Sequence, residues 1–375
     1  MITIEYRLLL DGRALGRAEL DRVQTVTVTR SVYEPGEADV EILICAGSDG
    51  RWLDAGTDLV APCRRVRVEL RVGSGAFQPI FEGTSCGVEM RMAAEPGASV
   101  QHLRAYDDTT LLDYSDPDPQ PLSGAPHQVV QALLDDVESF RGDLPQVPAT
   151  DGNAGVRGQN VPWQGSAFAT IEKLAQDQRR LFFVKPGKQA GYSIACFKEP
   201  TREVSSRYPP LVLLGRDRNV DSFETSHEYS QAGDFSGAAL RLEDRSVAKR
   251  SARLDEGQFI GTRSALPDRC KPPRRVLHPL ELMNEYLVDT VVDRQTEESG
   301  YLVTANARLR TREYGAVIEP DTLLVVTGAE LSRCGTYYVE AVTHTLDRSE
   351  YIQALQLRRN AAQTAAAASL PLGRV

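Results

Sequence analysis

Residues 319–360 read EPDTLLVVTGAELSRCGTYYVEAVTHTLDRSEYIQALQLRRN, and they set the architecture expected for the chain. Three runs in this segment alternate apolar with polar residues, separated by a glycine-bounded turn and by an Asp-Arg-Ser-Glu turn. Such alternation is typical of a strand that buries one face. The segment therefore predicts a meander of antiparallel strands. Almost none of its side chains are suited to catalysis, which favours a scaffold.

Strand patterns also fill residues 1–118. The most regular segments are VQTVTVTRSVY (23–33), ADVEILIC (38–45) and RRVRVELRVG (64–73). One side of the last segment is apolar, and the other side consists of Arg65, Arg67, Glu69 and Arg71. We expect a half-buried antiparallel strand with a charged solvent or interface side. Several strands at this spacing, with Gly and Pro turns between them, favour a barrel or a sandwich.

A proline-rich segment, SDPDPQPLSGAP (115–126), interrupts the strand pattern and predicts a domain boundary. Helical periodicity begins at Pro126, a residue that suits the first turn of a helix. Ser166 fits the N-cap of a second helix, and the strand segments LFFVKPG and GYSIACFKEP follow it. Residues 119–205 are therefore predicted to form a small α+β module.

The strand pattern returns over residues 206–360, which are predicted to form a second β domain with one helix. The helix is expected in HPLELMNEYLVDTVVDRQTEESG (278–300). Residues 245–275 are polar without a sustained apolar period, and they predict a long loop. The Ala-rich segment 361–375 has no apolar face to bury and is expected to be mobile.

The composition, 41% hydrophobic and 25% charged over 375 residues, is typical of a soluble globular chain of two or three domains. A net charge of −9 argues against a dedicated nucleic-acid binder, although in a ring only the charge of the lumen matters. The N-terminal MITIEYRLLLDGRALG has no signal-peptide pattern, and no apolar run is long enough to span a membrane. We expect neither standard export nor a membrane partner.

The cysteines are scattered, with no CxxC pair and no matching histidine spacing: Cys45, Cys63, Cys86, Cys196, Cys270 and Cys334. In a long chain without a signal peptide, reduced and mostly buried thiols are expected, because disulfides belong to oxidising compartments. This favours the bacterial cytoplasm, at least during assembly.

Residues for chemistry are sparse. The five histidines lie far apart without metal-ligand spacing, and each is expected to be a surface or satisfied core histidine. Within the acidic clusters YDDTTLLDYSDPDP and LLDDVE, the segment DPDP resembles a linker and DDVE resembles the solvated face of a helix. No GxSxG nucleophile motif occurs. We predict no catalytic, cofactor-binding or metal-binding residues, and no cofactor.

The order of strand domain, helix-containing insertion and strand domain resembles the phage late control protein D family. That family comprises the baseplate hub of contractile phage tails and the N-terminal hub part of type VI secretion (VgrG) spike proteins. Besides the meander, the similar segments are PIFEGTSCGVEM (79–90), SVQHLRAYDDTTLL (99–112), NVPWQGSAFATIEKLAQDQRRLFFVKPG (160–187) and LLGRDRNVDSFETSHEY (213–229). Their order, more than any single motif, carries a resemblance that covers about residues 1 to 360.

The resemblance implies a mainly β fold, with two tube-protein-like β-barrel domains and a small helix-containing module between them. A homotrimer would then present six barrels as a pseudo-sixfold ring that adapts a hexameric inner tube to a trimeric spike. Because type VI spike proteins continue into a needle, whereas this chain stops at Val375, a separate spike protein is implied. The other implied partners are the inner tube protein and further baseplate proteins of a phage tail or extracellular injection particle.

Two other functions stay open from the sequence. A tail-associated cell-wall hydrolase would need a convergent carboxylate pair or a zinc site. A carbohydrate-binding tail-tip protein would need exposed aromatic platforms, and the chain has only Trp52 and Trp163.

Residues 245–275 also supply a candidate assembly interface. They hold nine Lys or Arg against three Asp or Glu, in a chain that is acidic elsewhere. The segment is either a solvated loop or one that orders against an acidic neighbouring subunit, where charge pairing would fix register. The candidate interface residues are Lys249, Arg250, Arg253, Arg274 and Arg275.

Overall fold

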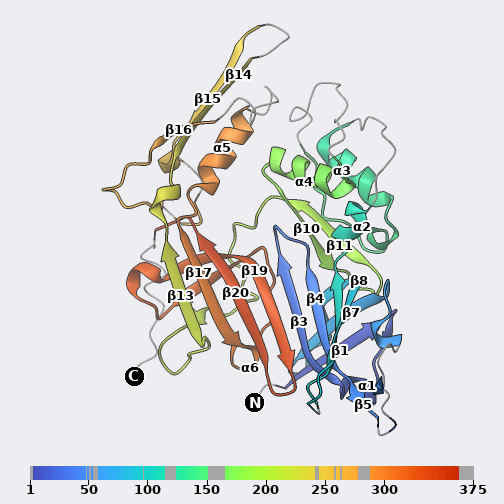
Figure 1. Cartoon of the computed structure of the whole chain (residues 1–375). Helices are drawn as coiled ribbons and strands as arrows, with labels where there is room; N and C mark the ends of the chain where they lie inside the picture. The colour runs from blue at the N-terminus through green and yellow to red at the C-terminus, as the bar shows by residue number, and fades with distance from the viewer. Residues whose placement is uncertain are drawn as a thin grey trace.

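The computed structural model describes residues 3–47, 49, 52–53, 58–95, 97–114, 124–150, 165–240, 245–256, 259–261, 264–277 and 288–362. Figure 1 shows a broad sheet, a helix-containing module above one side of it and a narrow arm rising above the other. The chain is mainly β, with the module placed between two strand regions, which confirms the predicted fold class.

A single sheet of thirteen strands runs through both strand regions in the order β13-β17-β20-β19-β3-β4-β9-β8-β7-β1-β2, while β18 pairs with β19 and β12 with β18. The first region supplies β1 (Ile4–Leu10), β2 (Arg13–Ala14), β3 (Val23–Ser31), β4 (Glu37–Leu43), β7 (Arg65–Val72), β8 (Gln78–Arg91) and β9 (Val100–Tyr106). The second supplies β12 (Leu211–Val212), β13 (Ser222–His227), β17 (Val303–Arg310), β18 (Thr322–Thr327), β19 (Gly335–Asp347) and β20 (Tyr351–Arg359). The meander predicted over residues 319–360 is confirmed as β18, β19 and β20, with antiparallel pairing throughout.

The two strand regions join along β19. One edge of this strand pairs with β20, and the other pairs first with β18 through residues 335–339 and then with β3 through residues 341–347. A register shift between Val339 and Ala341 lies close to the point where the partner changes. The predicted β domains are therefore hydrogen-bonded into one sheet, because β19 is long enough to serve both.

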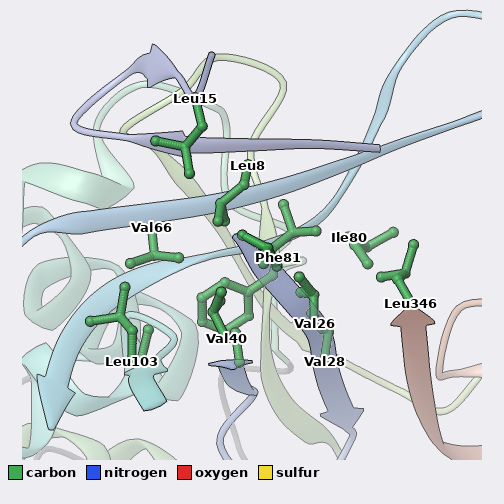
Figure 2. Packing of buried hydrophobic residues seen from close by; sticks show 14 of the residues in the cluster. Leu8, Leu15, Val26, Val28, Val40, Val66, Ile80, Phe81, Leu103 and Leu346 are labelled. Atoms are coloured by element: carbon green, nitrogen blue, oxygen red, sulfur yellow. The ribbon is translucent and has the colours of Figure 1, made fainter. Parts of the chain in front are cut away.

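Each strand region keeps its own hydrophobic core. In the first, Leu8, Val40, Val66 and Phe81 converge from neighbouring strands, and Leu346 of β19 reaches the same cluster (Figure 2). A second cluster is built from β12 and β17 to β20, with Leu324, Tyr337 and Leu355 among its buried members. The first core is thus completed by residues of the second region, among them Val317, Leu346 and Tyr351.

The module contains α2 (Thr109–Asp113), α3 (Pro126–Asp135), α4 (Ala167–Asp177) and a hairpin of β10 (Leu181–Pro186) and β11 (Ser193–Lys198). Pro126 lies in the first turn of α3, as predicted. The Ser166 hydroxyl accepts a hydrogen bond from the Ala169 backbone N–H at 3.2 Å, which confirms the predicted N-cap of α4. Ile171 and Phe197 are fully buried in the core between the helices and the hairpin.

The arm corrects the long loop expected over residues 245–275. Its sheet has the order β15-β14-β16 and consists of β14 (Asp234–Leu240), β15 (Val247–Ala252) and β16 (Arg274–Val276). The sequence did not predict these strands because the side of β15 that packs against the helix carries small alanines. The larger apolar residues that cover these alanines come from α5 (Val288–Glu298). Helix α5 confirms the second half of the predicted helix, whereas residues 278–287 and the tail from residue 363 lie outside the described residues.

Short elements complete the described part of the chain: α1 (Arg17–Leu20), β5 (Cys45–Ala46), β6 (Trp52–Leu53), η1 (Asp58–Val60), η2 (Glu138–Phe140), η3 (Tyr229–Gln231), η4 (Leu254–Glu256), α6 (Thr311–Tyr314) and η6 (Leu331–Arg333). Among the described helices, none combines the length and apolar character that crossing a membrane requires.

The expectation of mostly buried thiols is wrong for half of the cysteines. Cys45, Cys63 and Cys86 are exposed, whereas Cys196 and Cys334 are buried. Burial raises the pKa of the Cys196 thiol to about 11. The exposed cysteines lie on or beside strands of the first region.

Candidate assembly surface

The five candidate interface residues all lie on or beside the arm, which Figure 1 shows above the left half of the main sheet. Helix α5 packs against one face of the three-stranded sheet. Phe235 and Ala239 of β14 and Ala248 and Ala252 of β15 contact the cluster formed by Leu277 and the α5 valines. Since side chains alternate along each strand, the even-numbered residues of β14 and the odd-numbered residues of β15 lie on the opposite face of the arm.

Arg250 and Arg275 belong to the helix-facing side and are engaged within the chain. The Nε–H and one Nη–H group of Arg250 donate to the two carboxylate oxygens of Asp293 on α5, at N–O distances of 2.9 and 3.0 Å. Arg275 donates to the backbone carbonyl of Ser230 at 2.7 Å and lies 6.0 Å from the centre of the Phe235 ring. These two arginines therefore hold the arm together.

Arg253 follows β15 and contacts Asp255 at 2.8 Å, with both side chains more than 60% exposed. An ion pair this exposed contributes little to stability because water and salt screen it. Asp255 also neutralises the charge of Arg253, so Arg253 adds less to a cationic surface than the count of basic residues in the segment suggests.

Lys249 and Arg274 lie on the face that none of the described residues covers, which we call the uncovered face. The register places Lys249 opposite Ala238 and Arg274 opposite Asp234, and both basic residues are exposed. Three aliphatic residues of the same face are also exposed: Leu240 by 55%, Val247 by 52% and Val276 by 80%. Within the described residues, this face combines aliphatic side chains with two cations, a mixture typical of interaction surfaces.

The aliphatic part of this surface was missed from the sequence. Leu240, Val247 and Val276 sit in a segment whose basic residues dominate its composition. The available signal was the two-residue spacing of Val247 and Lys249 and of Arg274 and Val276. Which of the two sides α5 covers is decided by the tertiary structure.

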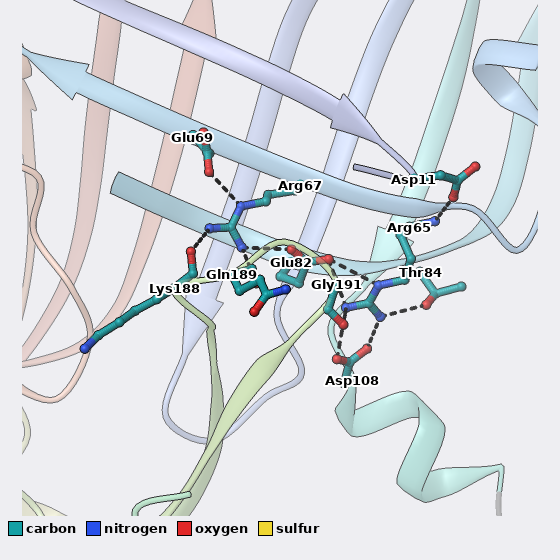
Figure 3. Close-up of polar contacts among 10 residues, drawn as sticks. All are labelled: Asp11, Arg65, Arg67, Glu69, Glu82, Thr84, Asp108, Lys188, Gln189 and Gly191. Atoms are coloured by element: carbon teal, nitrogen blue, oxygen red, sulfur yellow. Dashed lines mark hydrogen bonds and ion pairs between the residues drawn. The ribbon is translucent and has the colours of Figure 1, made fainter. Parts of the chain in front are cut away.

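A second charged cluster lies on β7, whose charged side was expected to face solvent or an interface (Figure 3). Arg67 is 2% exposed and contacts Glu82 of β8 at 2.9 Å and Glu69 at 2.8 Å. It also donates to the backbone carbonyls of Lys188 and Gln189, at 3.1 and 3.3 Å. The charged side of β7 is thus an internal interface that fastens the β10-β11 hairpin to the main sheet.

Arg65 extends this network. Its guanidinium contacts Glu82 at 2.9 Å, pairs with Asp108 through two hydrogen bonds and donates to the Gly191 carbonyl at 3.3 Å. Burial raises the pKa of Glu82, while the two arginines oppose that shift. Because arginines occupy both carboxylates, the cluster is suited to joining segments rather than to proton transfer.

Asp107 is a buried carboxylate with a structural task. It accepts hydrogen bonds from the backbone N–H groups of Gly36 at 2.7 Å and Thr109 at 3.1 Å. Burial raises its pKa to about 6. A Cβ atom at position 36 would lie 2.7 Å from the Asp107 carboxylate, so the close approach requires glycine. Asp107 thereby ties the turn between β3 and β4 to the start of α2.

The other residues that the sequence offered for catalysis or metal binding are dispersed in the fold. Within the described residues, no group of three or more His, Cys, Asp and Glu side chains is suited to hold a metal ion. Asp135 and Asp136, from the LLDDVE cluster, are exposed at the end of α3, as the solvated-face interpretation predicts.

No family model and no curated protein matches the sequence, whereas solved structures match the fold. The 43 kDa tail protein of prophage MuSo2 from Shewanella oneidensis superposes with a TM-score of 0.67 and 13% identity, covering 96% of this chain and 100% of that chain. A tail protein from Neisseria meningitidis gives 0.65 and 10% identity, with coverage of 97% and 99%.

A component of the E. coli type VI secretion system, described as similar to the T4 bacteriophage tail proteins gp27 and gp5, gives a TM-score of 0.55 and 11% identity. The likeness covers 96% of this chain and 77% of that chain. These identities are low, so the comparisons establish the fold and do not transfer residue roles. The chain has the fold that these phage tail proteins share with the type VI secretion component.

Proposed function

We propose that this chain is the structural baseplate hub of a contractile injection machine, either a phage tail or an extracellular injection system. The supporting observation is the likeness to phage tail proteins over nearly the whole length of both chains. In this proposal three copies form a ring that adapts the hexameric inner tube to a trimeric spike, as the late control protein D resemblance implies. The protein assembles in the bacterial cytoplasm and then becomes part of the particle.

The joint between the strand regions suits such a ring. Residues 1–118 and 206–360 would act as two tube-like units, with residues 119–205 as the module between them. Pairing of β3 with β19 makes the two units continuous, so their relative orientation cannot vary freely. A trimer would then repeat six units around one axis, and heterologous contacts between them form a closed ring when the rotation from unit to unit closes.

The uncovered face of the arm is the proposed contact with a neighbouring acidic subunit. Lys249 and Arg274 supply the charge, and the surrounding aliphatic residues supply the area to be buried. The remaining proposed partners are the inner tube protein, a separate spike protein and other baseplate proteins. The role is a scaffold without a catalytic step, since Glu82, Asp107 and Asp108 serve to join segments of the chain.

Native mass spectrometry tests the proposal directly. The purified chain should be a trimer, or should become one when its spike and tube proteins are added. The chain without the spike is the control, and trimer formation only in the complete mixture also fits the proposal. A stable monomer or dimer in the presence of both partners would rule out the hub assignment.

A further inference from the structure

The arm sheet has an unpaired edge along the outer side of β15. This strand pairs with β14 over residues 247–252, and no described residue pairs with its other side. Helix α5 packs against a face of the sheet, and Figure 1 shows the β14-β15 hairpin rising past the end of the helix. A row of unpaired N–H and C=O groups can pair with a strand of another chain.

Two backbone hydrogen bonds show which residues of β14 face β16. The Asp234 N–H donates to the carbonyl of Pro273 at 3.0 Å, and the Leu277 N–H donates to the carbonyl of Ser236 at 2.9 Å. Asp234 and Ser236 therefore direct their backbone groups toward β16. Successive residues of a strand direct these groups to opposite edges, so the odd-numbered residues of β14 direct theirs toward β15.

The register carries this assignment over to β15. The odd-numbered residues of β14 lie opposite the even-numbered residues of β15, with Gly237 opposite Arg250 in the middle, and these pairs exchange the hydrogen bonds between the strands. The backbone groups that point away from β14 are therefore those of Val247, Lys249 and Ser251. Among the described residues, none bonds to these outward groups, and all three residues are exposed.

The side chains of these three residues lie on the uncovered face, so the edge and that face form one continuous surface. Val247 is 52% exposed and lies opposite Leu240, which is 55% exposed. Lys249 supplies the charge of this surface, because Arg250 lies on the helix side and pairs with Asp293. A strand added at the edge would thus meet an aliphatic group and a cation two residues apart.

The spacing of the outward groups indicates the class of ligand. Alternate residues of a strand repeat at about 7 Å, which is twice the rise of about 3.4 Å per residue. An extended polypeptide has donors and acceptors at the same repeat, so it can pair with all three positions. A second copy of β15 is a poor occupant, because residues 245–252 contain three basic residues and no Asp or Glu, and like charges on facing strands destabilise the pair. The charge therefore favours a strand with an acidic side chain.

We propose that the outer edge of β15 binds an extended segment of a neighbouring protein, which adds one strand to the arm sheet. Its backbone pairs with Val247, Lys249 and Ser251, and an acidic side chain on the uncovered face pairs with Lys249. An apolar side chain two residues away covers Val247 and Leu240. The inference rests on the proposed function for the identity of the neighbour as a subunit of the assembly, and it adds backbone pairing to the contact proposed there.

Calorimetric titration of the full-length chain at low salt tests the edge with the blocked peptide acetyl-Thr-Val-Thr-Glu-Thr-Val-Thr-amide. The peptide carries Val, Glu and Val on one face and reads the same in both directions, so it fits a parallel or an antiparallel arrangement. We expect one peptide per chain, and weaker binding as salt rises. The same peptide with Lys in place of Glu is the control and should bind about tenfold more weakly.

Two substitutions at one position separate backbone pairing from charge. Lys249→Thr removes the charge and keeps the outward N–H, and it should weaken peptide binding several-fold. Lys249→Pro removes both, and it should weaken binding about tenfold more than Lys249→Thr does. Proline is tolerated on an edge strand where its nitrogen faces away from the sheet, so both variants should keep the melting temperature of the parent.

Amide hydrogen exchange in the parent gives a second measurement that depends on no variant. Bound peptide should slow exchange about tenfold or more at Lys249 and Ser251, whose N–H groups point outward. Exchange at Ala248 and Arg250 should stay unchanged, because β14 already pairs with these residues.

Equal affinities of Lys249→Thr and Lys249→Pro, unchanged exchange at Lys249 and Ser251, or equal binding of the lysine peptide would overturn the proposal. A dimer of the chain alone that Lys249→Pro dissociates would assign the edge to a second copy and overturn it as well. Native mass spectrometry keeps this result apart from the hub assignment. Trimer formation without peptide binding rejects strand addition alone, whereas peptide binding by a chain that forms no trimer with its spike and tube proteins rejects the hub assignment and leaves the strand site.

Discussion

His344 on β19 illustrates how the tertiary structure assigns a role to a single residue. It is fully buried, and its Nδ1 atom lies 2.7 Å from the hydroxyl of Tyr351. Burial, and then the positive charge of Arg30, lower its pKa to about 3. The imidazole is therefore neutral at physiological pH, which agrees with the expectation of a core histidine.

This lowered pKa makes stability depend on pH. In the unfolded chain a histidine takes up a proton near pH 6.5, whereas folded His344 does so only near pH 3. Protonation therefore favours the unfolded state as the pH falls below about 6.5, at no more than about 1.4 kcal/mol per pH unit. Urea unfolding at pH 7, 6 and 5 should show this loss in the parent and not in His344→Gln, which keeps a hydrogen-bonding group for Tyr351.

Asp107 shifts the opposite way, because its raised folded pKa of about 6 favours the folded state as the pH falls through that value. Its contribution is present in both proteins and cancels in the difference between them. Parallel pH profiles for parent and variant would contradict the role assigned to His344.

We predict that removing one carboxylate from the charged network between β7, β8 and the β10-β11 hairpin strongly lowers the free energy of unfolding. Glu82→Ala would leave the buried Arg67 and the partly buried Arg65 short of a partner, and removing one member of a buried pair typically costs about 3–5 kcal/mol. Glu5→Ala is the matched control, since its pair with Arg71 is partly exposed and is expected to contribute less than about 1 kcal/mol. The free energies of unfolding in urea distinguish the two, and equally small losses would contradict the fastening role.

We predict that substitutions on the uncovered face of the arm block assembly without changing the folding of the isolated chain. Lys249→Glu combined with Arg274→Glu should leave the melting temperature of the isolated chain unchanged and block reconstitution with its partners, most strongly at low salt. Arg250→Glu is the contrasting variant, because it places two carboxylates together and should loosen α5 from β15. Normal assembly of the double variant at low salt would place the interface elsewhere.

At the scale of the whole molecule, the two strand regions are predicted to depend on each other. A fragment of residues 1–118 lacks Val317, Leu346 and Tyr351, which complete its core, and leaves the outer edge of β3 unpaired. We expect this fragment to lack cooperative unfolding and well-dispersed amide resonances, and to regain both when residues 206–375 are supplied separately. A fragment 1–118 that unfolds cooperatively as a monomer would show that the two units are independent.

The sequence by itself determined the features that rest on local spacing. Two-residue alternation located the strands of the 319–360 meander, and the change to helical spacing at Pro126 located the module. The hydroxyl of Ser166 identified the start of α4 before any fold was considered. These predictions hold because periodicity and caps are properties of a few consecutive residues.

Only the tertiary structure decided which faces and edges are covered. Arg67 belongs to a polar pattern, yet it is buried because Glu82 and the carbonyls of residues 188 and 189 surround it. The alanines of β15 became a buried face only through α5, and the pairing of β3 with β19 joins segments more than 300 residues apart. The physical reason is the same in each case: a local pattern sets which side chains share a face, while the partner of that face comes from a remote part of the chain.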